Sequence, residues 1–134
     1  MSAANERVRR VVLVDDDEDM LSLLHVVISG EEGYEVVGTA RDGYEAVAEA
    51  VRERPDIILL DLEMPHLDGI HALPHLREAA PHARIIVFSA FPDPYTLLDV
   101  VERGADAYVD KANAWAQLVP TMAAVCELEP TATA

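Results

Sequence analysis

Four short apolar runs of the sequence each end at side chains that could bind a cation or contact a phosphate group. The residues at these four ends are Asp15 and Asp16, Asp61, Ser89, and Asp110 with Lys111. Carboxylates are preferred ligands of hard divalent cations, a hydroxyl can donate a hydrogen bond, and an ammonium group stabilises negative charge. The chain has nine arginines but only one lysine, and that lysine follows an apolar run after a single aspartate, Asp110. Together with an acidic overall balance, these residue types favour a divalent metal as ligand.

The elements that must position these side chains are predicted as alternating strands and helices. Short apolar runs without alternation are typical of strands buried on both faces, here at residues 11–14, 34–40, 56–60, 84–88 and 107–109. Helical patterns follow each of them, which predicts a parallel sheet with helices on both faces. Ligands of open α/β sheets bind beyond the carboxyl ends of the strands. We therefore expect the acids, the serine and the lysine to meet at one edge of the sheet.

Each predicted helix carries an apolar stripe that should face the sheet. The stripes consist of Met20, Leu21, Leu23, Leu24, Val27 and Ile28; of Tyr44, Val47, Ala48 and Val51; of Ile70, Leu73 and Leu76; of Leu97, Leu98, Val100 and Val101; and of Leu118, Met122 and Val125. Asp17 is the predicted N-cap of the first helix, followed by Glu18 and Asp19 in its first turn. Pro120 lies inside the predicted last helix, where it should kink the helix or delay its start.

Length and composition indicate one globular domain of 134 residues, with 51% hydrophobic and 26% charged residues. No apolar run approaches the roughly 18–20 residues that span a bilayer, and the polar N-terminus does not resemble a signal peptide. The single cysteine, Cys126, cannot form an internal disulfide, which fits a cytoplasmic protein. With 25 acidic and 10 basic residues the net charge is −15, so this domain is not expected to bind nucleic acid directly.

With these motifs in order, the sequence resembles the receiver domain of bacterial response regulators. The most specific segment runs from Asp61 to Gly69 (DLEMPHLDG), between the acidic pair Asp15-Asp16 and the later Ser89-Ala90 and Tyr108 to Lys111. Residues 41–90 are most similar to receivers that often precede helix-turn-helix DNA-binding domains. The resemblance divides the chain into an N-terminal extension (1–9), a receiver domain (10–128) and a tail (129–134). It implies a flavodoxin-like (βα)5 fold, a single doubly wound sheet of five parallel strands in the order 2-1-3-4-5.

The resemblance also implies a role for each site residue. Asp61 would be the phosphoacceptor, taking a phosphoryl group from a histidine kinase or a histidine phosphotransfer protein. Mg²⁺ would be held by Asp15, Asp16, Asp61 and the backbone carbonyl of Glu63, and the acids near the first helix would share metal binding and capping. Lys111 would pair with Asp61 at rest and with a phosphoryl oxygen afterwards.

A switch is implied for Ser89 and Tyr108. Ser89 would donate a hydrogen bond to the phosphoryl group, and Tyr108 would then turn inward and change the surface formed by the fourth helix, fifth strand and fifth helix. That surface would act on an unknown output partner or form a weak homodimer. Glu63 and Phe91 occupy positions that would tune the lifetime of the phosphoryl group. Whether an output domain belongs to the same protein stays open.

Other interpretations of the sequence are weaker. A magnesium-dependent phosphatase of the dehalogenase type needs an aspartate two residues after its nucleophile, where this chain has Glu63. Nucleotide hydrolysis is not expected either, because the sequence has no glycine-rich phosphate loop before a helix. A receiver fold that serves only as a constitutive interaction surface is the main alternative. His71 and His75 have a metal-binding spacing but no evident third ligand, and Cys126 is predicted as a small hydrophobe on the last helix. We predict a signalling module and no enzyme acting on other substrates.

Overall fold

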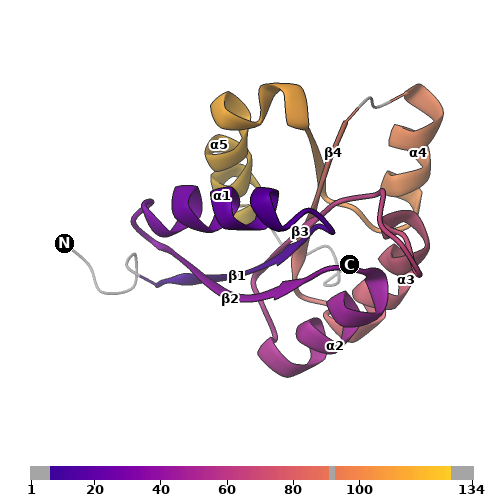
Figure 1. The fold of residues 1–134 in the computed structure, drawn as a ribbon, viewed down its shortest axis with the longest axis horizontal. Helices are drawn as coiled ribbons and strands as arrows, with labels where there is room; N and C mark the ends of the chain where they lie inside the picture. Colours follow the sequence, from indigo (N-terminus) through magenta and orange to yellow (C-terminus); the bar gives the residue numbers. More distant parts are fainter. Residues whose placement is uncertain (1–6, 91–92, 128–134) are drawn as a thin grey trace.

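The computed structural model describes residues 7–90 and 93–127, which form five strands and five α-helices in alternation (Figure 1). The strands are β1 (Arg9–Val14), β2 (Tyr34–Ala40), β3 (Ile57–Leu60), β4 (Arg84–Ser89) and β5 (Ala107–Asp110). The helices are α1 (Glu18–Ser29), α2 (Gly43–Glu53), α3 (Gly69–Ala79), α4 (Pro94–Glu102) and α5 (Ala114–Cys126), with a short 3-10 turn, η2 (Lys111–Asn113), before α5. Phe91, the predicted tail and residues 1–6 of the predicted extension lie outside the described residues.

All strand pairs are parallel, and the strand order is β2-β1-β3-β4-β5, which confirms the predicted fold. Helices α1 and α5 cover one face of the sheet, and α2, α3 and α4 cover the other (Figure 1). Alternate residues of β1 enter the two cores: Val11 and Leu13 pack toward α1 and α5, whereas Val12 and Val14 pack toward the other helices. Burial on both faces explains why these strands have continuous apolar sequences.

The predicted apolar stripe of α2 is only partly correct, because Val47 alone of its four residues packs against the core, and it is half-buried. Tyr44 is 66% exposed, and Ala48 and Val51 are exposed as well, whereas Ala46 and Ala50 are completely buried. Small residues face the core because α2 packs closely: a Cβ on Gly43 would lie 2.7 Å from the carbonyl oxygen of Leu67. Larger side chains at these positions would force the helix away from its neighbours.

The predicted stripe of α4 is only partly correct, because Val100 alone is completely buried and Leu98 and Val101 are exposed. Leu23 of α1 is exposed too. In α5 the predicted residues Leu118, Met122 and Val125 are all buried.

The expected delay of the last helix by Pro120 is also wrong, since α5 begins at Ala114, six residues earlier. Pro120 is exposed, and its missing N–H removes a single bond, to the carbonyl group of Ala116. The kink stays a prediction. Cys126 is a free, half-buried residue that packs against the α1–α5 core, in agreement with its predicted role. Among the described residues, no helix is long and apolar enough to cross a membrane.

Gly69, the first residue of α3, fixes the approach of this helix to the end of β3. Its N–H donates to the carbonyl oxygen of Leu62 at 2.9 Å, and a Cβ would overlap the carbonyl oxygen of Asp61. We expect Gly69→Ala to lower the free energy of unfolding by about 1–3 kcal/mol in urea denaturation. Gly30→Ala is the control, because its Cβ would find ordinary contacts and its φ is −79°. Equal stability of Gly69→Ala and Gly30→Ala would contradict the packing described.

Candidate functional site

Asp15 and Asp61 are neighbours because they follow the adjacent parallel strands β1 and β3. The Asp61 N–H donates to the carbonyl oxygen of Val14 at 3.0 Å, and the Asp15 N–H donates to that of Ala40 at 3.0 Å. Asp15 is 1% exposed and Asp61 4%, whereas Asp16 is exposed. One carboxylate oxygen from each of the three lies within 4.8 Å of the others. The predicted gathering of acids at this edge is therefore observed.

Lys111 reaches both buried carboxylates from the end of β5. Its Nζ donates to Oδ2 of Asp15 at 2.9 Å and forms an ion pair with Oδ1 of Asp61 at 3.5 Å. The predicted pair with Asp61 is present, but the closer partner is Asp15, which the sequence did not indicate. Nζ also lies 5.6 Å from the ring centroid of Phe88. One ammonium group is therefore the ion-pair partner of two carboxylates that are almost completely shielded from water.

The charges at this site shift the pKa values of its members. Burial and the neighbouring charge of Asp15 raise the pKa of Asp61 from 3.8 to about 6, and Lys111 opposes them only in part. Burial would lower the pKa of Lys111, but the hydrogen bond to Asp15 and the charge of Asp61 raise it above its usual value. The remaining negative charge is therefore under-compensated, and a further cation would be favourable here.

Neither Asp15 nor Asp16 is needed to cap α1, because Asp17 does so. Asp17 caps α1 by accepting from the N–H groups of Asp19 at 2.9 Å and Met20 at 3.4 Å, as predicted. Helix capping thus falls to Asp17, and Asp16 keeps an exposed carboxylate beside Asp15. Three carboxylates suit Mg²⁺, which needs few protein oxygens and keeps several waters. The backbone carbonyl of Glu63 stays a predicted ligand.

The hydroxyl and the tyrosine of the predicted switch lie beside the acids. Ser89 ends β4, is 2% exposed and pairs in register with Asp110 of β5. The hydroxyl of Tyr108 donates to the carbonyl oxygen of Ser89 at 3.3 Å, and burial raises the pKa of this tyrosine. A cavity of about 570 Å³ adjoins both; its lining includes Leu62, Glu63, Met64, Ile70, Ser89 and Tyr108.

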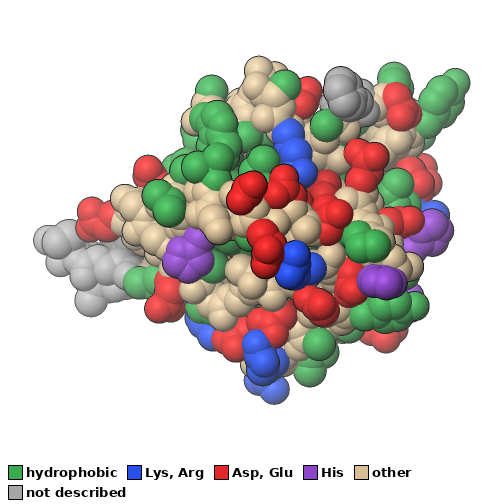
Figure 2. Space-filling view, viewed as in Figure 1, with side chains coloured by type: hydrophobic (Ala, Val, Ile, Leu, Met, Phe, Trp, Pro, Cys, Tyr) green, Lys and Arg blue, Asp and Glu red, His purple; other side chains and the backbone are tan. Residues whose placement is uncertain are grey.

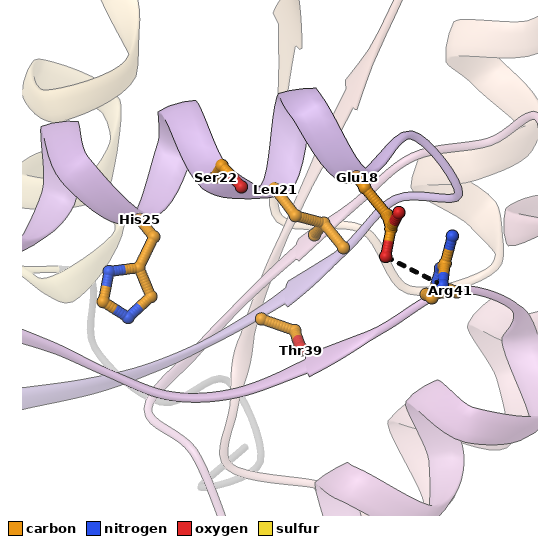
Figure 3. Close-up of a pocket in the computed structure, with 6 residues that line it drawn as sticks. All are labelled: Glu18, Leu21, Ser22, His25, Thr39 and Arg41. Carbon is orange, nitrogen blue, oxygen red and sulfur yellow. Dashed lines mark ion pairs between the residues drawn. The ribbon is translucent and has the colours of Figure 1, made fainter.

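A second hollow, of about 420 Å³, lies between α1 and β2 (Figure 3). Its lining residues are Glu18, Leu21, Ser22, His25, Thr39 and Arg41. An exposed ion pair of 3.1 Å between Glu18 and Arg41 closes one end of it. Asp15, Asp61 and Lys111 do not line this hollow, so it is separate from the acidic site.

His71, one of the two histidines considered for metal binding, contacts the residue that caps its own helix. Nδ1 of His71 lies 2.9 Å from both carboxylate oxygens of Asp68, which caps α3. Within residues 7–90 and 93–127, Asp15, Asp16 and Asp61 form the one group of His, Cys, Asp and Glu residues arranged to hold a metal. Acidic side chains are spread over the face seen in Figure 2, with few basic ones between them.

Comparison with known proteins assigns the family. Residues 11–123 match the response regulator receiver domain, and the chain belongs to this family. Chemotaxis protein CheY of Thermotoga maritima is 36% identical over 103 residues, which cover 77% of this chain and 85% of that protein. Transcriptional regulatory protein LiaR of Bacillus subtilis is 36% identical over 121 residues, or 90% of this chain and 57% of that protein.

Solved structures agree with this assignment. The response regulator domain of Thermotoga maritima CheB superposes with a TM-score of 0.85 at 29% identity, covering 92% of this chain and all of that one. A two-component response regulator of the LuxR family from Aurantimonas has a TM-score of 0.84 at 34% identity, covering 88% of this chain and 84% of that one. Several curated relatives are longer: the match covers 28%, 32% and 57% of three of them. Receiver domains bind Mg²⁺ at a cluster of aspartates and accept phosphoryl groups from histidine kinases.

The raised pKa of Asp61 predicts how stability depends on pH. An aspartate with a native pKa of about 6 and an unfolded value near 3.8 costs stability when it ionises. The cost is absent below pH 4, grows as the pH rises from 4 to 6, and is complete above pH 6. In metal-free buffer, Asp61→Asn should therefore be more stable than the wild type by on the order of 2 kcal/mol at pH 7.5, with no such gain at pH 3.5.

Urea denaturation at several pH values measures this difference. Glu35→Gln removes an exposed carboxylate of β2, away from any helix N-terminus, and serves as the control, whose stability should follow that of the wild type. An Asp61→Asn protein that is less stable than the wild type at pH 7.5 would contradict the destabilisation that we expect from ionised Asp61.

Proposed function

We propose that this chain is the phosphoacceptor module of a two-component pathway, with Asp61 as the residue that is phosphorylated. An oxygen of Asp61 forms a bond to the phosphorus of a phosphohistidine while the phosphorus–nitrogen bond breaks, and the histidine nitrogen keeps the electron pair. The donor is a histidine kinase or a histidine phosphotransfer protein. The observation that carries the proposal is the buried Asp15–Asp61 pair contacted by one lysine and flanked by the exposed Asp16.

Metal binding prepares the carboxylates for an anionic substrate. Asp15, Asp16, Asp61 and the backbone carbonyl of Glu63 would hold Mg²⁺, and the bound cation would neutralise charge that otherwise repels the phosphoryl group. Asp15 is oriented for this role by two contacts, since its Oδ1 accepts from the N–H of Asp17 at 2.9 Å and its Oδ2 from Lys111.

Lys111 follows the charge from carboxylate to phosphate. Its flexible stem already spans Asp15 and Asp61, so a short movement brings Nζ to a phosphoryl oxygen. There it stabilises the negative charge that develops during transfer. Ser89, buried at the end of β4, donates from the other side.

The output surface is formed by α4, β5 and α5. When Ser89 bonds to the phosphoryl group, Tyr108 gives up its present position and moves toward the adjoining cavity. Helix α4 carries an exposed apolar stripe at helical spacing, and its members are Tyr95, Leu98 and Val101. Such a stripe suits an output partner or a second copy in a weak homodimer.

The wider assignment rests on composition and resemblance. Residues 10–128 form the receiver domain between a short extension and a tail, and the module works in the cytoplasm. The net charge of −15 disfavours direct contact with nucleic acid. Some relatives are named protein-glutamate methylesterase/protein-glutamine glutaminase, but this chain covers 28% of one of them and matches there as a receiver. We infer self-phosphorylation and autodephosphorylation without activity on other substrates; Glu63 and Phe91 influence the lifetime of the phosphoryl group.

Incubation with Mg²⁺ and acetyl phosphate, followed by intact-mass spectrometry, tests this proposal. The wild type should gain one phosphoryl group, and Asp61→Asn none. Asp19→Asn, which keeps the site whole, should be modified like the wild type. Lys111→Gln should be modified about tenfold or more slowly, because transition-state charge loses its ammonium partner.

Modification of Asp61→Asn, or equal modification of the wild type in excess EDTA, would contradict the mechanism. The second candidate function is a constitutive interaction module, to which the exposed apolar stripe of α4 would be equally suited. It would be favoured if the folded wild type binds Mg²⁺ but is modified neither by acetyl phosphate nor by any of a panel of phosphorylated histidine kinases.

A further inference from the structure

Arg77, in the last turn of α3, joins three segments at the edge of the sheet opposite the acidic site. Its Nη1 donates to the carbonyl oxygen of Ala83 at 2.6 Å, just before β4. Its Nη2 donates to the carbonyl oxygen of Gly104 at 2.5 Å and to Oδ2 of Asp106 at 2.8 Å, both between α4 and β5. The planar guanidinium group can hold several acceptors at fixed directions, which an ammonium cannot.

The partners of Arg77 are themselves tied to the sheet. Oδ2 of Asp106 also accepts from the N–H of Ile85 at 2.8 Å, and the N–H of Asp106 donates to the carbonyl oxygen of Ile85 at 2.8 Å. Gly104 has a φ of +118°, and a Cβ there would lie 3.2 Å from Nε of Arg77. The chain leaving α4 therefore passes directly against the guanidinium group.

The two ends of α4 are held unequally. At the C-terminal end Val100 is completely buried, and the N–H of Ala105 donates to its carbonyl oxygen at 2.9 Å. At the N-terminal end Tyr95 is 85% exposed. The side-chain hydrogen bonds there, as far as the described residues extend, join Asp93 to Thr96 within the same turn. This weakly held end lies near the carboxyl end of β4, where Ser89 is placed (Figure 1).

We propose that Arg77 is a positioning residue that fixes the C-terminal end of α4, so that the helix moves about this end when Asp61 is phosphorylated. The inference rests on the proposed function and concerns how the site reaches its output surface. A phosphoryl group bonded to Ser89 acts at the carboxyl end of β4, which precedes the N-terminal end of α4 in the chain. Because Arg77 holds the far end, the movement becomes a rotation of the exposed stripe about a fixed point.

Amide hydrogen exchange, followed residue by residue by NMR with and without Mg²⁺ and beryllofluoride, tests the inference. Beryllofluoride serves as a phosphomimetic in the solved receiver domain of RcsB from Salmonella enterica. In the wild type, exchange should change at residues 94–98 and stay constant at residues 100–106. In Arg77→Gln, exchange at residues 100–106 should be faster by about tenfold and should respond to beryllofluoride. Its rate of modification by acetyl phosphate should stay within about twofold of the wild type.

Arg103→Gln is the matched control, because it removes the same charge at the same end of α4 but breaks only the 2.7 Å ion pair with Asp99. Its exchange pattern should match that of the wild type. If Arg77→Gln does not fold, Asp106→Asn removes the charge partner with little change of shape and should loosen the same residues.

Three results would overturn the inference. The first is a change of amide exchange in the wild type that is spread evenly along α4. The second is an exchange pattern in Arg77→Gln and Asp106→Asn that equals that of the wild type. The third is faster exchange throughout all helices of these variants, which would mean a merely structural role. If beryllofluoride leaves the amides of Asp61 and Ser89 unchanged in the wild type, the proposed function fails, and the inference fails with it.

Discussion

Two carboxylates buried side by side, with one ammonium group to compensate them, are the constraint on which this structure depends. Asp15 and Asp61 lie at the ends of adjacent strands, and Lys111 contacts both. The compensation is incomplete, because the pKa of Asp61 rises to about 6. A site that costs stability when empty gains it when a divalent cation binds, since the cation removes the repulsion between the acids. The same charge imbalance thus links stability to metal binding and, under the proposed function, to the acceptance of a phosphoryl group.

The remainder of the fold serves to hold this imbalance in place. A parallel sheet brings the carboxyl ends of β1, β3, β4 and β5 to one edge, and cores on both faces keep the strands rigid. Asp17 and Asp68 cap α1 and α3, so neither Asp15 nor Asp61 is needed as a helix cap. At the opposite edge, Arg77 ties α3 to the chain between α4 and β5. One edge can therefore respond to charge while the other stays fixed.

Much of this arrangement could be predicted from the sequence, because strand runs, helix order and the position of acids after strands are local patterns. The buried face of α2 could not: Tyr44 and Ala50 both fit helical periods, and only the close approach of α2 decides that the smaller residue faces inward. The closer contact of Lys111 with Asp15 than with Asp61 depends on where the ends of three strands place these side chains in space, which spacing along the sequence does not reveal. The contacts of Arg77 depend on segments that are distant in the sequence and that only the folded chain brings together.

The charge imbalance is measured most directly by following the NMR chemical shift of the Asp61 carboxyl carbon as a function of pH. The protein is labelled with ¹³C-aspartate, and Asp61→Asn serves to assign the signal. Without metal, we expect an apparent pKa near 6 for this group. Saturating Mg²⁺ should lower that pKa, because the cation favours the ionised form. A pKa near 4 that does not change when Mg²⁺ is added would contradict the charge imbalance at this site, since Asp61 would then carry no unbalanced charge for a metal ion to neutralise.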